Sequence, residues 1–228
     1  MTQSDSRPAW FSFKPILAGA SLGDRALACL GAFLGIAAAT GAGLGVQQYA
    51  TAMPYLFASV GASAVLVFAI PASPLAQPWP VIGGNIVSAL VGVAAARHIG
   101  NVYVAGSVAV GAAIFVMSLL RCLHAPGGGT ALIPIIGGPA IASLGYSFAL
   151  ILVAINAVAL VLIGLLFHRF TQHSYPHRAQ APAMPVGLLR EDIDRAVAEA
   201  HETFDIDPAD LEALLMKAEV FAERRRGK

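Results

Sequence analysis

The sequence predicts an all-α polytopic membrane protein, and three observations support this fold class. Of the 228 residues, 57% are hydrophobic and 12% are charged, whereas soluble domains carry about 25% charged residues. Apolar runs long enough to cross about 30 Å of hydrocarbon recur along the chain. None of the 13 acidic residues lies between Arg25 and Arg190. The apolar body can therefore offer an ion positive charge but no carboxylate, which argues against proton coupling through a buried acid.

Five apolar stretches predict a bundle of five to six membrane helices, with broken or short helices at two loops rich in glycine and proline. Four stretches are single spans, at Ala26–Val46, Pro54–Ile70, Ile82–His98 and Val102–Cys122. The fifth, Ala131–Phe167, is too long for one span. Its Gly137-Gly138-Pro139 sequence suggests a short or half helix that leads into a full one from about Ser147.

Basic residues flank the membrane body at both ends, so the positive-inside rule places both termini in the cytoplasm. An even number of crossings follows, and one element must be short or re-entrant. Residues 1–24 form an N-terminal interfacial segment, anchored by Trp10, Phe11 and Phe13 beside Lys14. We expect a multi-pass protein of the bacterial inner (plasma) membrane.

The chain after the transmembrane domain, residues 25–170, has a different composition. Residues 171–188 are a linker with proline and alanine, and residues 189–228 hold 11 of the acidic residues. A first helix has its apolar residues at amphipathic spacing, at Leu189, Ile193, Val197 and Phe204. Asp207-Pro208 then supplies an N-cap and a first-turn proline for a second helix. We expect a cytoplasmic helical hairpin that packs on itself and on a neighbouring subunit, giving a homo-oligomer.

A short internal repeat indicates where function lies. Pro80-Val81-Ile82-Gly83-Gly84-Asn85 is echoed 54 residues later by Pro134-Ile135-Ile136-Gly137-Gly138-Pro139, and each copy follows a loop of small residues. If helices begin at Pro80 and Pro134, their free N–H groups and positive dipole ends form an anion site, as in transporters with broken helices. Tight helix–helix contacts explain the same motif equally well.

Polar residues gather around the second loop. Arg121, His124 and Thr130 bracket Gly127-Gly128-Gly129, and consecutive glycines permit a nest of backbone N–H groups that binds an anion. A membrane-interface role explains Arg121 as well, and an ordinary hydrogen-bonded position explains His124. In the functional interpretation, His124 donates to an anion or carries a proton near neutral pH.

Several ordered motifs resemble the HPP family of integral membrane proteins. The segments that carry the resemblance are Gly61–Leu66, Ser73–Pro78 with Ile82-Gly83-Gly84, and His124–Leu132, within roughly residues 20–170. The resemblance implies a multi-span bundle, nitrite transport in some photosynthetic members, and CBS domains in some longer ones. Two positions depart from the family pattern: Ala125 replaces the first proline of His-Pro-Pro, and Asn85 stands where many relatives have histidine.

The candidate substrate-binding residues are the polar and glycine positions of these motifs. Around the second loop and the helix break they are Arg121, His124, Pro126, Gly127, Gly128, Gly129, Thr130, Gly137 and Gly138. In the first repeat and the segments before it they are Ser63, Ser73, Gln77, Gly83, Gly84 and Asn85. We expect no catalytic residue, no metal ligand and no cofactor, because HExxH and GxSxG do not occur and Cys29 and Cys122 suit buried apolar positions.

Three functions are compatible with these features. The leading one is a channel or transporter for a small inorganic anion, nitrite or a related one, through a pathway lined by the two loops. The second is a structural or regulatory membrane protein that presents the acidic tail. The third is an intramembrane enzyme in which Ser63 or Ser73 is the nucleophile and His124 the base. The expected partners are the lipid bilayer, the anion and further copies of the chain, with no nucleic acid.

Overall fold

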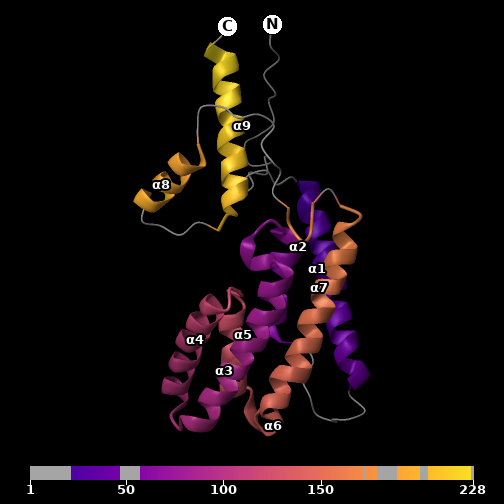
Figure 1. Cartoon of the computed structure of the whole chain (residues 1–228). Helices are drawn as coiled ribbons and strands as arrows, with labels where there is room; N and C mark the ends of the chain where they lie inside the picture. The colour runs from indigo at the N-terminus through magenta and orange to yellow at the C-terminus, as the bar shows by residue number, and fades with distance from the viewer. Residues whose placement is uncertain (1–21, 47–56, 172, 179–188, 201–204, 227–228) are drawn as a thin grey trace, which may run out of the picture.

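The computed structural model describes residues 22–46, 57–171, 173–178, 189–200 and 205–226, and these residues form nine α-helices and no strand (Figure 1). The predicted all-α class is therefore confirmed. The aromatic anchor of the N-terminal segment and most of the linker lie outside the described residues. The body contains α1 (Leu22–Val46), α2 (Ala58–Ala69), α3 (Asn85–His98), α4 (Val102–Leu119), α5 (Gly127–Ile136), α6 (Gly138–Leu144) and α7 (Ala154–His168).

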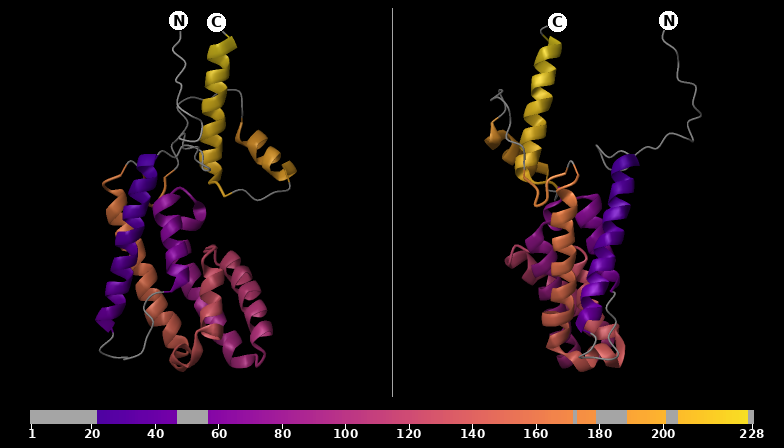
Figure 2. Two further views of the ribbon diagram at one scale, coloured as in Figure 1. Left: turned by 180° about the vertical axis from the view of Figure 1, so that it is seen from behind. Right: turned by 90° about the vertical axis from the view of Figure 1, so that its right-hand side faces the viewer.

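The longer helices of the body run side by side along one axis, and α6 turns away from it at 104° to α5 (Figures 1 and 2). Within the described ranges, four helical segments are long and apolar enough to cross a membrane, at Leu22–Ala42, Pro80–His98, Val102–Leu119 and Phe148–His168. The bent pair α5–α6 adds a fifth candidate span, and α2 is a shorter apolar helix. The start of α1 and the end of α7 lie at the same end of the body (Figure 1).

Three short helical turns complete the body. A 3₁₀ turn, η3 (Pro74–Ala76), lies in the loop after α2, and two π-helical turns, η4 (Pro80–Gly84) and η5 (Phe148–Val153), lead into α3 and α7. Pro80 is the first residue of η4, but residues 78 and 79 are already helical and the Val81 amide donates to the Gln77 carbonyl at 3.0 Å, so the helix start with free N–H groups predicted at Pro80 is wrong. A π-helical turn widens the helix by one residue and often occurs at functional sites.

The second copy of the repeat has a different conformation, and the helix start predicted at Pro134 is wrong. Pro134 lies inside α5, which already begins at Gly127. The chain breaks three residues later, where α5 and α6 meet at 104°. Gly138 has a φ of 78°, a conformation that a residue with a Cβ rarely adopts. The short helix predicted before the last span is thus confirmed, but it begins at Gly127, before Pro134.

Close contact between α3 and α5 holds the centre of the body together. A Cβ added at Gly92 would overlap the backbone carbonyl of Ala131, so the two helices touch through main-chain atoms. Apolar side chains around Met117 and Cys122 surround this contact. Cys122 is buried as predicted, but Cys29 is exposed, because it lies on the outer side of α1. The sequence allowed two interpretations of the glycine-rich motifs, an anion site or a tight helix–helix contact. At Gly92 of α3 the tight helix–helix contact applies.

The tail consists of α8 (Arg190–Ala200) and α9 (Pro208–Arg226) (Figure 1). Asp207 caps α9 by accepting a hydrogen bond from the Ala209 amide at 2.8 Å, as the sequence predicted. Arg190 of α8 and Glu212 of α9 are 3.4 Å apart. No described residue of α9 is buried, and the Phe221 side chain is 57% exposed. Within the described chain, the apolar side chains of α9 are thus largely exposed.

Replacing Gly92 by alanine should destabilise the protein by about 1–3 kcal/mol, because the added methyl group forces α3 away from the Ala131 carbonyl. The matched control is Gly111→Ala in α4, where a Cβ has nothing within 4 Å. The measurement is the thermal unfolding midpoint of the purified protein in detergent. Equal midpoints for the two variants would show that α3 and α5 do not approach each other at Gly92.

Candidate functional site

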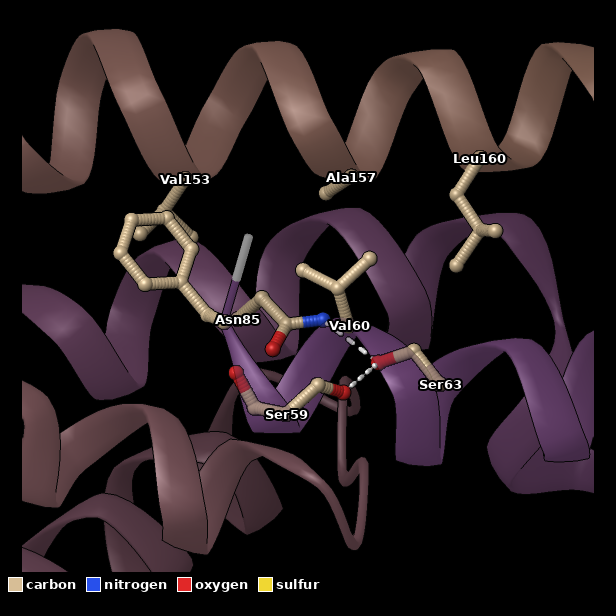
Figure 3. Close-up of a pocket in the computed structure, with 8 residues that line it drawn as sticks. Ser59, Val60, Ser63, Asn85, Val153, Ala157 and Leu160 are labelled. Atoms are coloured by element: carbon tan, nitrogen blue, oxygen red, sulfur yellow. Dashed lines mark hydrogen bonds between the residues drawn. The ribbon is translucent and has the colours of Figure 1, made fainter. Parts of the chain in front are cut away.

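Four polar side chains from three helices and one loop meet inside the body. Ser63 comes from α2, Asn85 begins α3, Thr130 lies in the second turn of α5, and His124 lies in the loop before α5. All four are buried, and His124 has no exposed surface. Figure 3 shows Ser63 and Asn85 pointing toward each other beneath α7. We call these four residues the polar chain.

Hydrogen bonds join the members of the polar chain in order. The Thr130 hydroxyl donates to Asn85 Oδ1 at 2.6 Å, and Asn85 Nδ2 donates to Ser63 Oγ at 3.3 Å. Ser63 Oγ lies 2.8 Å from His124 Nε2, and His124 Nδ1 lies 2.8 Å from the carbonyl oxygen of Leu75. The chain therefore connects α5, α3 and α2 with the loop that contains η3.

The Leu75 carbonyl fixes the tautomer of His124. A carbonyl oxygen only accepts hydrogen bonds, so Nδ1 must carry the proton that it donates to Leu75. In a neutral imidazole the other nitrogen, Nε2, is then an acceptor, and the Ser63 hydroxyl donates to it. Every bond of the polar chain thus has a defined direction, from Thr130 to Leu75.

The local sequence explains how Asn85 and His124 reach their positions. Asn85 directly follows the π-helical turn η4, and its side-chain amide also donates to the Val81 carbonyl inside that turn, at 2.8 Å. Gly84 leaves room for the histidine, since a Cβ at this position would come within 2.6 Å of the Cβ of His124. The amide of Gly127 donates to the His124 carbonyl at 2.9 Å, which ties the loop to the start of α5.

A small cavity adjoins the polar chain. Its volume is about 10 Å³, roughly the space that one water molecule needs. Its lining residues come from the start of α2, the start of α3 and the η5–α7 segment, and they are Phe57, Ser59, Val60, Ser63, Asn85, Val153, Ala157 and Leu160 (Figure 3). The polar side is formed by Ser59, Ser63 and Asn85, so a bound water or polar ligand would contact the chain there.

Burial keeps His124 neutral. His124 lies in the loop between α4 and α5, and desolvation lowers its pKa from 6.5 to about 4, although the hydrogen bond to Leu75 acts in the opposite direction. Among the described residues, no group of three histidine, cysteine or acidic side chains could hold a metal ion. The site therefore consists of neutral hydrogen-bonding groups.

The structure brings together only some of the predicted site residues. His124, Thr130, Asn85 and Ser63 meet, but Arg121 is exposed and lies in a turn with a φ of 53°. Pro126 is the N-cap of α5, and the three glycines after it form the first turn of this helix in place of an open nest. Gly83 packs beside the Trp79 ring, and Gly137 and Gly138 lie at the bend after α5.

Ser73 and Gln77 belong to the loop between α2 and η4, residues 71–78, which we call the η3 loop. Their side chains face the tail side of this loop. The Ser73 hydroxyl donates to the Asp205 carboxylate at 2.8 Å, and Gln77 Oε1 accepts from the His177 amide at 2.8 Å. The Tyr175 hydroxyl donates to the Ala76 carbonyl at 2.9 Å. The η3 loop therefore contacts His124 through Leu75, the linker through Ala76 and Gln77, and the tail through Ser73.

Sequence reasoning missed Ser59 and the carbonyl of Leu75. Ser59 and Ser63 are four residues apart in an otherwise apolar helix, so their common face could have been recognised from the sequence. Leu75 could not, because it contributes a main-chain atom and its side chain carries no signal.

These features define a class: a polytopic helical membrane protein with a neutral, hydrogen-bonded polar chain in its interior. Within that class the particular family is also established. Residues 18–176 match the model of the HPP transmembrane region, and the chain belongs to the HPP family. The resemblance predicted from the motifs is thus confirmed.

Two proteins of Dictyostelium discoideum, both named as transmembrane proteins, are similar to this chain. One is 38% identical over 129 residues, which cover 54% of this chain and 45% of the relative. The other is 37% identical over 127 residues, which cover 54% of this chain and 40% of the relative. The chain thus spans less than half the length of these relatives. No solved structure matches it.

Replacing Thr130 by valine should destabilise the protein by about 1–3 kcal/mol, because the buried Asn85 carbonyl loses its donor while the side-chain shape is kept. Ser118→Ala is the control, since this exposed hydroxyl bonds only within its own helix, to the Ile114 carbonyl. Unfolding midpoints in detergent measure both effects. A Thr130→Val protein as stable as the control would show that Asn85 does not depend on this donor.

The stability of the protein should depend on pH through His124. Its folded pKa is about 4 and its unfolded pKa about 6.5, so the unfolded chain binds a proton first as the pH falls. The favourable contribution is complete above pH 6.5 and is lost as the pH falls toward 4. The measurement is the difference in unfolding free energy between the natural protein and His124→Gln across this range. A difference that does not change with pH would contradict a buried neutral His124.

Proposed function

We propose that the protein moves a small inorganic anion, nitrite or a related one, across the membrane through the region of the polar chain. The observation that carries the proposal is the polar chain itself, in which Ser63, Asn85, Thr130 and His124 are buried in an apolar helical body. We further propose that the protein resides in the bacterial inner membrane as a homo-oligomer with both termini in the cytoplasm.

The sign of the expected solute follows from the charges around the site. Between Arg25 and Arg190 the chain has basic residues but no acidic one. The start of α5 adds the positive end of its dipole beside His124. A cation would find no carboxylate in this body, whereas an anion at the cavity would meet the hydroxyls of Ser59 and Ser63 and the amide of Asn85.

The size of the cavity indicates what must move during passage. It holds about one water, so nitrite enters only if the wall of Val60, Ala157 and Leu160 retreats. These apolar residues belong to α2 and α7. We therefore propose that the described conformation is closed and that α2 and α7 separate when the anion passes.

The pair of Ser63 and His124 also has the geometry of a nucleophile and its base, with Leu75 as the orienting group. We propose that the pair serves translocation and that the protein is not an enzyme, because the body between Arg25 and Arg190 has no carboxylate to stabilise the imidazolium that a catalytic serine–histidine pair forms.

The contacts of the tail favour a second candidate function. Asp205 is bonded to Ser73, and His177 lies 2.6 Å from Asp210, so the tail is held against the η3 loop. A regulatory or structural protein that presents its acidic tail would use these contacts. In that case removal of residues 189–228 would abolish function, whereas His124→Gln would not.

Purified protein in liposomes should take up nitrite, and His124→Gln should reduce the initial rate at least tenfold, because the polar chain loses its terminal imidazole. Nitrate, formate, chloride and sulfate are measured alongside. His98→Gln is the matched control, since this histidine is exposed at the end of α3. Empty liposomes give the background, which matters because nitrous acid crosses lipid unaided.

Uptake equal to that of empty liposomes for all five anions would contradict the proposal. Uptake that is unaffected by His124→Gln but lost without the tail would favour the regulatory candidate.

A further inference from the structure

The Ser63 hydroxyl has two acceptors within reach but a single proton. Its oxygen lies 2.8 Å from His124 Nε2 and 2.9 Å from the carbonyl oxygen of Ser59. The hydroxyl can donate to either acceptor by rotating about its C–O bond, and the heavy atoms need not move. Two complete hydrogen-bond arrangements are therefore available in the same geometry.

The two arrangements correspond to two protonation states of His124. When the imidazole is neutral, the Ser63 hydroxyl donates to Nε2. When Nε2 carries a proton, it donates to Ser63 Oγ, and the hydroxyl turns to the Ser59 carbonyl. In both states Nδ1 donates to Leu75, and the second lone pair of Ser63 Oγ can accept from Asn85. Neither state leaves a buried group of the polar chain without a partner.

We propose that His124 is a proton-binding site and that the anion crosses the membrane together with one proton, so that the transported class is weak monobasic acids. This inference rests on the proposed anion transport. An entering acid HX transfers its proton to Nε2: the X–H bond breaks, the N–H bond forms, and the anion X⁻ keeps the bonding electrons. On release the proton returns to X⁻, and no net charge has moved.

The surroundings of His124 explain why proton and anion must bind together. Polar groups face His124 from α2, the η3 loop, α3 and α5. They are hydroxyls, amides and carbonyls, which do not titrate. At the end of α4, burial raises the pKa of the Cys122 thiol, which stays uncharged, and the Arg121 side chain is exposed. The described neighbours thus supply no carboxylate to balance an imidazolium.

The coupling between proton binding at His124 and anion binding is reciprocal. Because desolvation disfavours the charged imidazole, His124 stays neutral near pH 7 when the site holds no anion. A bound anion supplies the missing negative charge and favours protonation, and by linkage the proton favours anion binding by the same factor. Because the polar groups around His124 do not titrate, the proton reaches Nε2 only on the solute itself. Anions of strong acids, such as nitrate and chloride, arrive without a proton and should be carried poorly.

The test uses the full-length protein in liposomes, with the pH gradient and the membrane potential set independently by buffers and by potassium with valinomycin. Net nitrite flux should stop when the pH gradient balances the nitrite gradient, and changes in potential should not move this point. Nitrite and formate should enter at least tenfold faster than nitrate and chloride, after subtraction of empty liposomes.

Variants of Ser63 separate the hydroxyl switch from simple packing. Ser63→Ala should reduce proton-driven nitrite flux about tenfold or more, the factor expected for one lost hydrogen bond to a charged group. Ser63→Thr keeps the hydroxyl, can place its methyl group in the adjoining cavity, and should restore the flux. Ser88→Ala is the control, because this buried serine bonds to the Met117 sulfur outside the polar chain.

Ring-nitrogen NMR of labelled histidine gives a readout independent of flux. The His124 signal, assigned by comparison with His124→Gln, should change from neutral to imidazolium when nitrite is added at mildly acidic pH, and not when nitrate is added. Ser63→Ala should prevent this change, and Ser88→Ala should not.

Two results would overturn the inference. Net nitrite flux that depends on the membrane potential and not on the pH gradient would support the anion pathway but contradict proton coupling through His124. A lack of uptake for every anion and gradient would overturn both the pathway and the coupling.

Discussion

The hydrogen bond from His124 to the Leu75 carbonyl is the constraint on which the polar interior depends. It assigns a proton to Nδ1, so in the neutral imidazole Nε2 is an acceptor, which in turn orients Ser63, Asn85 and Thr130. Inside an apolar body each of these groups must find a partner in the protein, because unsatisfied polar groups are costly there. One main-chain oxygen thereby determines the direction of a hydrogen-bond chain that crosses three helices.

Close helix packing makes that chain possible. The polar residues reach one another because α3 and α5 touch through glycine and main-chain atoms, and because Gly84 leaves the space that the His124 side chain fills. Small residues at helix contacts are common in membrane proteins, where approach of the backbones replaces the hydrophobic driving force. In this protein the same approach also brings together polar groups that lie far apart in the sequence.

Hydropathy predicted the helices closely but not their contacts. The span expected at Val102–Cys122 is α4, and the break expected at Gly137-Gly138 is the bend between α5 and α6. The contacts depend on how each helix is rotated about its axis, and helices that are apolar all round carry little information on this. Arg121 and His124 therefore seemed equivalent in the sequence, yet one is exposed and the other is buried. Pro134 was misplaced because a short repeated motif does not specify where a helix begins.

The η3 loop has a mechanical consequence for the whole molecule. Pro71, Pro74 and Pro78 fix the φ angles at three of its eight positions, so the loop is stiff. One side of this loop holds His124 through Leu75, and the other side contacts Asp205 before α9 through Ser73 and the linker residue His177 through Gln77. A stiff connection passes a displacement on and does not absorb it. A protein that pulls on the acidic tail would therefore shift the oxygen atom that determines the tautomer of the buried histidine.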